Sequence, residues 1–423
     1  MKRILLFACS LLFCLSVYTV QAQANDPGQV AKDAASNHAN SDMDNAADQG
    51  LNKAEQGIDN LFKKKKKDKK GTTATTQAST TNSTAGQGDD NSQNASGTQV
   101  PSIKTYQNYD FVAGDKIIFD DDFTADQDGE FPAHWGLTKG QAVVNKQEGF
   151  PSFTLTDGNY VEVYPKMTTK DYLGNEFTLE YDVYFETGGY GVYLMLHLPD
   201  VLDSQDGLLG VTNSEANYYS DQAGVSLQAA FPEAIAGNNY ENKWHHVAIG
   251  YKNKQIKIYV DQYRVLVIPD CKMEFGSVTF GGVASQEAPI IFKNVKIAQG
   301  GSQNMIGNIL TNGKFVTHGI TFDIDKSVIK PESMGVLNQV AKFLKENSSV
   351  NMEIDGHTDN TGVAAHNLTL SQQRADAVKS QLVSMGIDVS RLSTKGFGDT
   401  KPISNNGTPE GKANNRRVEF VKK

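Results

Sequence analysis

The feature that most limits how this chain can fold is a long polar stretch near its N-terminus. Residues 25–99 are rich in Ala, Asn, Asp, Gln, Ser, Thr and Gly, and Phe62 is the one aromatic residue among them. Such a composition cannot bury enough apolar surface to offset the entropy lost on ordering. We therefore predict a disordered, low-complexity tether over residues 25–108 and expect the folded domains to follow it.

One segment of this tether has a helical pattern. Apolar residues recur at helical spacing between Leu51 and Phe62, and a lysine run over residues 63–70 follows directly. A short amphipathic helix with a basic end could rest on an anionic membrane, which makes the outer-membrane surface a candidate partner. A solvated charge run is the alternative, because Gly50 and Gly57 weaken a helix.

The first residues have the pattern of a secretory signal peptide. Lys2 and Arg3 precede an apolar run over residues 4–20, and residues 22–24 supply a small-x-small cleavage site. We predict a signal peptide over residues 1–24 and secretion across the inner membrane. A short membrane anchor is the alternative, since the apolar run is not far below spanning length.

Composition narrows the classes of partner further. With 40 Lys+Arg against 49 Asp+Glu, the formal net charge is −9, which argues against a nucleic-acid partner bound through a basic surface. No later run is long and apolar enough to span a bilayer as a helix. Removal of the signal peptide would leave Cys271 as the only cysteine, so we expect a lone buried thiol.

Residues 109–300 have the composition of a β-rich domain, with aromatic and β-branched residues in short alternating runs. Alternation over residues 177–185 predicts a half-buried strand. Residues 244–251 and 255–261 are predicted to form a hairpin, and residues 263–268 continue the meander. We therefore predict an all-β jelly-roll sandwich.

Part of this segment resembles a known family. The runs Trp244–Ile249 and Ile256–Asp261 are similar to the concanavalin A/laminin-G-like lectin sandwich, although that family usually has Gly where this chain has Gln262. The resemblance implies that a glycan bound on the concave sheet is a candidate ligand.

Three acidic residues raise the alternative of catalysis. Glu180, Asp182 and Glu186 share strand parity, so their carboxylates could face one side, and paired carboxylates are what glycosidases use. In glycosidases of this sandwich type the third acid follows the aspartate by two or three positions, whereas Glu186 follows by four. We therefore favour a solvated polar face, with glycan binding or hydrolysis by the sandwich as the alternative.

The pattern changes again over residues 308–423, where strands and helices alternate. Short strands are predicted over residues 320–323, 350–355, 391–395 and 417–421. One helix begins at Pro331, and a second passes through Ala375 and Met385 and stops at Gly386. This order predicts a compact α+β domain.

Four blocks of residues, in order, carry the clearest resemblance in the chain. They are Gly356–Gly362, Asn367–Ala375, Gly396–Gly398 and Asn414–Glu419. Together they resemble the OmpA-like peptidoglycan-binding domain. One departure is Lys412, where that family more often has Arg, which keeps the charge but loses the planar fork.

The resemblance implies a groove that holds diaminopimelate, a component of the cell-wall stem peptide. The free end of diaminopimelate is zwitterionic, so its site needs an anion and a cation a few ångströms apart. Asp359 would bind the ammonium group, and Arg374 would hold the carboxylate as a bidentate fork. A structural ion pair between Asp359 and Arg374 is the alternative.

Four further residues are assigned to the same groove. By helical spacing from Arg374, Asn367 adds a hydrogen bond and Leu370 an apolar wall. Asp323 and Arg416 match family positions that line the groove.

These observations together predict a non-enzymatic cell-envelope protein of a Gram-negative bacterium. It would bind peptidoglycan without covalent attachment and lie in the periplasm, associated with the outer membrane and the cell wall. It would anchor either the outer membrane or its own lectin-like domain to that wall. No cofactor, no metal site and no catalytic residue is expected.

Overall fold

The computed structural model describes residues 109–199, 207–301, 309 and 311–423, all of which belong to one compact unit over residues 92–423. The predicted signal peptide, tether and lysine run lie outside the described residues. Among the described residues, no helix is long and apolar enough to cross a membrane.

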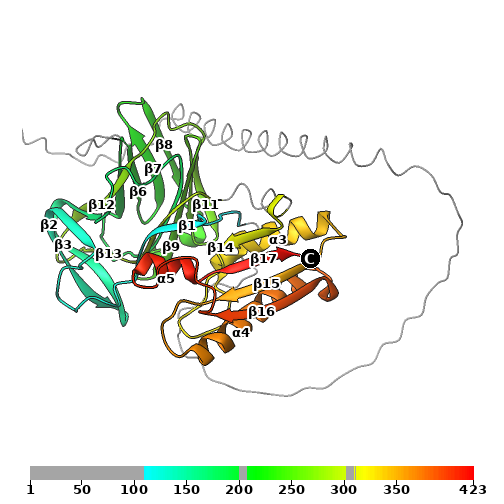
Figure 1. The fold of residues 1–423 in the computed structure, drawn as a ribbon. Coiled ribbons are helices and arrows are strands. Elements are labelled where there is room, and N and C mark those ends of the chain that lie inside the picture. The colour runs from blue at the N-terminus through cyan, green and yellow to red at the C-terminus, as the bar shows by residue number, and fades with distance from the viewer. Residues whose placement is uncertain (1–108, 200–206, 302–308, 310) are drawn as a thin grey trace, which may run out of the picture. The chain divides into compact units, whose positions relative to one another are not determined.

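The first part of the described chain is a large β-sheet domain (Figure 1). Its strands are β1 (Lys116–Asp121), β2 (Trp135–Gln147), β3 (Phe150–Pro165), β4 (Glu176–Tyr184), β5 (Val192–His197), β6 (Gly207–Val211), β7 (Glu215–Ser220), β8 (Val225–Ala230), β9 (Trp244–Lys252), β10 (Gln255–Val260), β11 (Tyr263–Ile268), β12 (Ser277–Ala284) and β13 (Ile290–Gln299). The hydrogen-bonded order is β11-β10-β9-β4-β13-β3-β12-β5-β6-β7-β8, with β1 on β13 and β2 on β3. The sheet folds over, since β11 contacts both β7 and β8. An all-β domain is therefore confirmed, and the jelly-roll topology stays a prediction.

Aromatic residues fill the core between the layers. Trp135 is fully buried and packs edge-on against Phe119 and Phe280, with ring centroids 5.3 and 5.4 Å away. Its Nε1 donates a hydrogen bond to Asp121 Oδ2 at 2.9 Å. Cys271 is a buried free thiol, as expected.

The predicted hairpin is confirmed by the register of β9 and β10, in which Lys252 pairs with Gln255. The two residues between them, Asn253 and Lys254, both have positive φ, of 50° and 66°. Positive φ at both central residues is the requirement of a tight type I′ turn, whose twist matches that of the flanking strands.

The prediction that β4 is half-buried was wrong. Alternate residues from Phe177 to Val183 face the core, but Thr178 and Glu180 on the opposite face are also buried. Beside Glu180 in the register lies Ala248, which packs in the same apolar cluster as segment 109–113 and the C-terminal domain. The outer face of β4, which the alternating pattern predicts to be solvated, is thus covered by tertiary packing.

In the part of the chain that the structure describes, the C-terminal domain combines a four-stranded sheet with the helices α3, α4 and α5. Its elements are β14 (Lys314–Thr317), α3 (Met334–Glu346), β15 (Met352–His357), α4 (Ala364–Ser384), β16 (Leu392–Gly398), α5 (Pro409–Asn415) and β17 (Val418–Lys422), with short 3-10 turns at Pro331–Ser333 and Val389–Arg391. The strand order is β14-β17-β15-β16, and β15 and β16 are parallel (Figure 1). Both predicted helices and three of the four predicted strands are confirmed.

The prediction of a strand over residues 320–323 was wrong. The first strand of this sheet is β14, and residues 320–323 contribute an isolated bridge between Phe322 and Ile329. Phe322 instead lies under the guanidinium of Arg374, whose Cζ is 5.0 Å from the ring centroid. The alternation therefore reflects packing beneath a charged side chain rather than pairing with another strand.

Candidate functional site

Asp359 lies in the loop that follows β15, and its side chain is 10% exposed. The backbone N–H of Thr361 donates to Asp359 Oδ1 at 2.8 Å, and Arg416 Nη1 donates to Oδ2 at 2.8 Å. Burial is the largest influence on the pKa of Asp359 and raises it, but the hydrogen bonds from Arg416 and Thr361 and the charge of Arg416 together outweigh burial and lower that pKa. A fixed, ionised carboxylate results.

The helix α4 supports this loop through Asn367. Asn367 is buried, and its Nδ2 donates to the carbonyls of Asp359 at 3.3 Å and Thr361 at 3.1 Å. Its amide hydrogens are therefore used to hold the loop that carries the carboxylate. Leu370 is also buried, one helical turn before Arg374, at the position expected for an apolar wall.

Arg374 is anchored by the segment 322–326 rather than by an acidic side chain. Its Nε donates to the carbonyl of Lys326 at 2.9 Å, and its Nη2 donates to the carbonyl of Asp323 at 3.2 Å. Burial lowers the pKa of Arg374, and the nearby charge of Arg416 lowers it further. Among the described residues, no ion pair joins Arg374 to Asp359, so the two charges are held near each other by separate partners.

The side chain of Asp323 is not the group that binds Arg374. Its carboxylate is 52% exposed and pairs with Lys326 Nζ at 3.1 Å. The contribution of Asp323 to the position of Arg374 comes from its backbone carbonyl.

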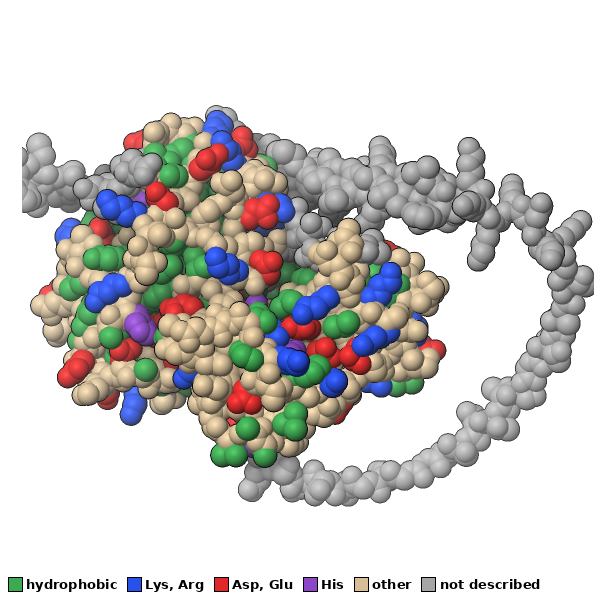
Figure 2. All heavy atoms as spheres, viewed as in Figure 1, with side chains coloured by type: hydrophobic (Ala, Val, Ile, Leu, Met, Phe, Trp, Pro, Cys, Tyr) green, Lys and Arg blue, Asp and Glu red, His purple; other side chains and the backbone are tan. Residues whose placement is uncertain are grey.

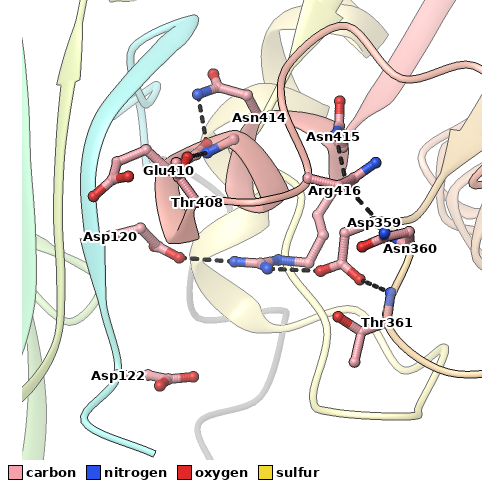
Figure 3. A network of polar contacts seen from close by, with 12 residues as sticks. Asp120, Asp122, Asp359, Asn360, Thr361, Thr408, Glu410, Asn414, Asn415 and Arg416 are labelled. Carbon is pink, nitrogen blue, oxygen red and sulfur yellow. Dashed lines mark hydrogen bonds and ion pairs between the residues drawn. The ribbon is translucent and has the colours of Figure 1, made fainter. Parts of the chain in front are cut away.

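Arg416 follows the end of α5 and bridges two carboxylates (Figure 3). Its Nη1 binds Asp359, and its Nη2 donates to Asp120 Oδ2 of β1 at 2.7 Å. Burial would lower the pKa of Arg416, but the charges of Asp120 and Asp359 raise it. Asp120 could not be predicted from the sequence as a partner of Arg416, because it lies 296 positions away in the β-sheet domain, inside an acidic run with no local pattern that singles it out.

The opposite side of the same sheet has a buried polar cluster of Asp355, His357 and Glu419, close enough together to suggest metal ligands. Both Glu419 oxygens are already bound by cations, Oε1 by Arg417 Nη2 at 2.7 Å and Oε2 by Lys314 Nζ at 2.6 Å. Positive charge at this point opposes a metal ion, so we assign none.

Figure 2 shows basic and acidic side chains mingled on the viewed face of this domain.

Two of the carboxylates that were candidates for catalysis in the β-sheet domain are bound to a histidine. Asp182 Oδ1 lies 2.8 Å from His246 Nδ1, and Glu180 Oε2 lies 3.5 Å from His246 Nε2. The other oxygen of Asp182 accepts a hydrogen bond from Asn294 Nδ2 at 2.6 Å. Glu186 lies beyond the end of β4 and outside this cluster.

We expect this cluster to make stability pH-dependent. Burial alone would lower the pKa of His246, but Asp182 and Glu180 raise it to about 10 from 6.5. The charged His246 contributes fully to the free energy of unfolding below pH 6.5. This contribution, on the order of a few kcal/mol, is lost as the pH rises through 10.

Urea unfolding at several pH values measures this change in the free energy of unfolding. His246→Gln, which cannot titrate, should flatten the profile; an unchanged slope in that variant would contradict the assignment.

Comparison with known proteins identifies the C-terminal domain. Residues 321–416 match the model of the OmpA family, and this part of the chain is an OmpA family domain. The probable lipoprotein YiaD of Escherichia coli (strain K12) is 45% identical over 114 residues, 27% of this chain and 51% of that protein. Outer membrane porin F of Pseudomonas fluorescens is 46% identical over 100 residues, 24% of this chain and 31% of that protein.

A third relative is the peptidoglycan-binding protein ArfA of Mycobacterium bovis. It is 44% identical over 107 residues, which are 25% of this chain and 33% of that protein. The chain thus spans about a third to a half of the length of these relatives, and in each case the match covers about a quarter of this chain.

Proposed function

We propose that this chain is a non-catalytic cell-envelope protein whose C-terminal domain binds peptidoglycan non-covalently. The observation that carries the proposal is the geometry of Asp359 and Arg374. One is an ionised carboxylate and the other a guanidinium, and each is held by other groups rather than by its counterpart. Such a pair suits a zwitterionic ligand that contacts both charges. The OmpA family match and the printed name of ArfA support the same conclusion.

The ligand group that fits best is the free end of diaminopimelate in the stem peptide. Each oxygen of Asp359 already accepts one hydrogen bond and keeps a further lone pair for an ammonium group. Arg374 uses Nε and Nη2 in the bonds described above, which leaves Nη1 to meet a carboxylate. Leu370 would contact the alkyl chain, with Asn367, Asp323 and Arg416 around the groove.

The cellular role that follows is anchoring. Relatives carry names such as outer membrane porin F and outer membrane protein A, which support a place in the cell envelope. A signal peptide over residues 1–24 would deliver the chain to the periplasm, and a tether over residues 25–108 would give reach. The protein would then connect the outer membrane, or its own β-sheet domain, to the wall.

We assign no catalytic residue in the β-sheet domain. Hydrolysis of a glycan would need Glu180, Asp182 and Glu186 free on one face, whereas the first two are bound to His246 and the third lies outside the strand. A glycan is kept as the candidate ligand of this domain.

The proposal is tested by varying the wall chemistry. The full chain should co-sediment with diaminopimelate-type peptidoglycan and bind lysine-type peptidoglycan at least about tenfold more weakly. Lysine has the ammonium but lacks the second carboxylate, which would leave Arg374 unpaired in the complex. Free diaminopimelate should compete, and cadaverine, the same diamine without the carboxylates, serves as the control at the same concentration. Equal binding to both walls would contradict the diaminopimelate assignment, and binding to neither would remove the proposed function.

A further inference from the structure

Arg416 is shared between the candidate groove and the β-sheet domain. Its Nη1 is bound to Asp359 in the groove, while its Nη2 is bound to Asp120 of β1 at 2.7 Å (Figure 3). Both terminal nitrogens of the guanidinium are thus directed at protein carboxylates. Arg416 lies near enough to Arg374 for its charge to lower the pKa of Arg374, so a ligand carboxylate held by Arg374 would find a second charged donor in Arg416 Nη2, which Asp120 now occupies.

The contact is reinforced by backbone recognition. Asn414, the second last residue of α5, accepts a hydrogen bond from the Ile117 N–H through Oδ1 at 3.0 Å, and its Nδ2 donates to the Ile117 carbonyl at 2.7 Å. Ala413 packs with Ile117 and Ala298 in a small apolar cluster. A side-chain amide therefore pairs with the edge of β1 much as a neighbouring strand would, three residues from the Asp120 contact.

We propose that β1 is an intramolecular competitor of the ligand, so that docking of β1 on α5 and binding of peptidoglycan oppose each other. This inference rests on the proposed function. In the docked state Asp120 takes the Arg416 donor and places a negative charge beside it. A ligand carboxylate arriving there would meet an occupied donor and a like charge, both of which weaken binding. Release of β1 would free the donor and remove the repulsion.

The electrostatics of Asp120 favour a reversible contact. Its side chain is only 20% exposed, and burial is the largest influence on its pKa, which is raised even though Lys296 and Arg416 oppose the shift. The carboxylate therefore loses hydration when β1 docks and regains it on release. Because coupling is reciprocal, a ligand that displaces Asp120 must loosen the docking of β1 by the same factor.

The test compares two aspartates of β1 and its flank in the full chain. Asp120→Ala should raise the affinity for soluble diaminopimelate-containing muropeptides about tenfold, within the range that site-to-site coupling usually spans. Asp122→Ala is the matched control. In the described residues the Asp122 side chain bonds only to Thr124, and Figure 3 shows it apart from Arg416. The Asp122→Ala protein should therefore bind muropeptides with the affinity of the wild type. Circular dichroism and thermal melting establish that both variants fold.

A second measurement needs no substitution. Saturating muropeptide should increase the hydrogen-exchange rate of the Ile117 amide several-fold, because that amide donates to Asn414 only in the docked state. The Cys271 amide, bonded to the Lys254 carbonyl inside the β-sheet domain, is the internal control.

The outcomes separate the two claims. Equal or weaker binding by Asp120→Ala, together with an unchanged Ile117 amide, would mean that Asp120 positions Arg416 and does not compete; the inference would fall while the proposed function stood. Binding by Asp120→Ala but not by the wild type would support the inference strongly. If neither protein binds any muropeptide, both the inference and the proposed function fall.

Discussion

Asp359→Asn and Arg374→Ala should each lower the affinity of the full chain for diaminopimelate-type peptidoglycan by about a hundredfold. Removing one partner of a buried, hydrogen-bonded charge pair typically costs about 2–5 kcal/mol, because the remaining charge is left buried and unpaired. Asp359→Asn keeps the shape of the side chain and its acceptor toward Thr361, but it sets an NH2 group against the Arg416 donor, so thermal melting of the same variant must establish that the fold is intact. Isothermal titration with purified muropeptides measures the loss.

Arg374→Lys distinguishes charge from geometry. Lysine keeps the positive charge but lacks the planar set of nitrogens with which Arg374 bonds the carbonyls of Lys326 and Asp323 through Nε and Nη2 and keeps Nη1 for a ligand. We expect an affinity between those of the wild type and Arg374→Ala.

Two controls accompany these variants. Lys379→Ala removes a charge from the same helix, and Glu410→Gln removes one from the first turn of α5. Both should bind as the wild type does. If Asp359→Asn and Arg374→Ala bind normally while folding normally, then the two charges serve only the fold, and the site assignment is incorrect.

Gly356→Ala should lower the free energy of unfolding by about 3 kcal/mol or more and should also weaken ligand binding. A Cβ at this position would lie 2.2 Å from the carbonyl oxygen of Ser371 in α4, a backbone atom that cannot rotate away. Gly396 on the parallel strand β16 is equally close to the same helix, 2.5 Å from the Gln372 nitrogen. The helix therefore rests directly on the backbone of two strands.

The effect on binding follows from the same contact. Asp359 lies three residues after Gly356, and Arg374 lies three residues after Ser371, so moving the helix off β15 separates the two charges. Urea unfolding and muropeptide titration on the same preparation measure both effects. Gly250→Ala is the matched control, because nothing lies within 4 Å of its Cβ position. Unchanged stability in Gly356→Ala would show that the helix can shift freely.

Elements with strong local periodicity were predictable from the sequence. The apolar spacing around Leu337 and Val378 reports burial on one helical face, and both helices appear where expected, with the second ending just before Gly386. The prediction of a strand over residues 320–323 failed for a different reason. Phe322 fits the alternating pattern of a strand, but its ring lies against the guanidinium of Arg374 and its backbone forms only an isolated bridge with Ile329. Alternation records which side chains are buried and not what buries them.

The sequence by itself thus determined that a β-rich domain precedes an α+β domain, and that Asp359 and Arg374 stand on neighbouring elements of the latter. These features depend on residues close together in the chain, whose spacing sets the face each side chain occupies. Only the tertiary structure decided that Glu180 is buried beside His246, that Asp359 is bound to Arg416, and that Asp120 shares that same guanidinium. All three contacts join positions far apart in the chain: the first two exist only once each domain has folded, and the third only once the two domains have packed.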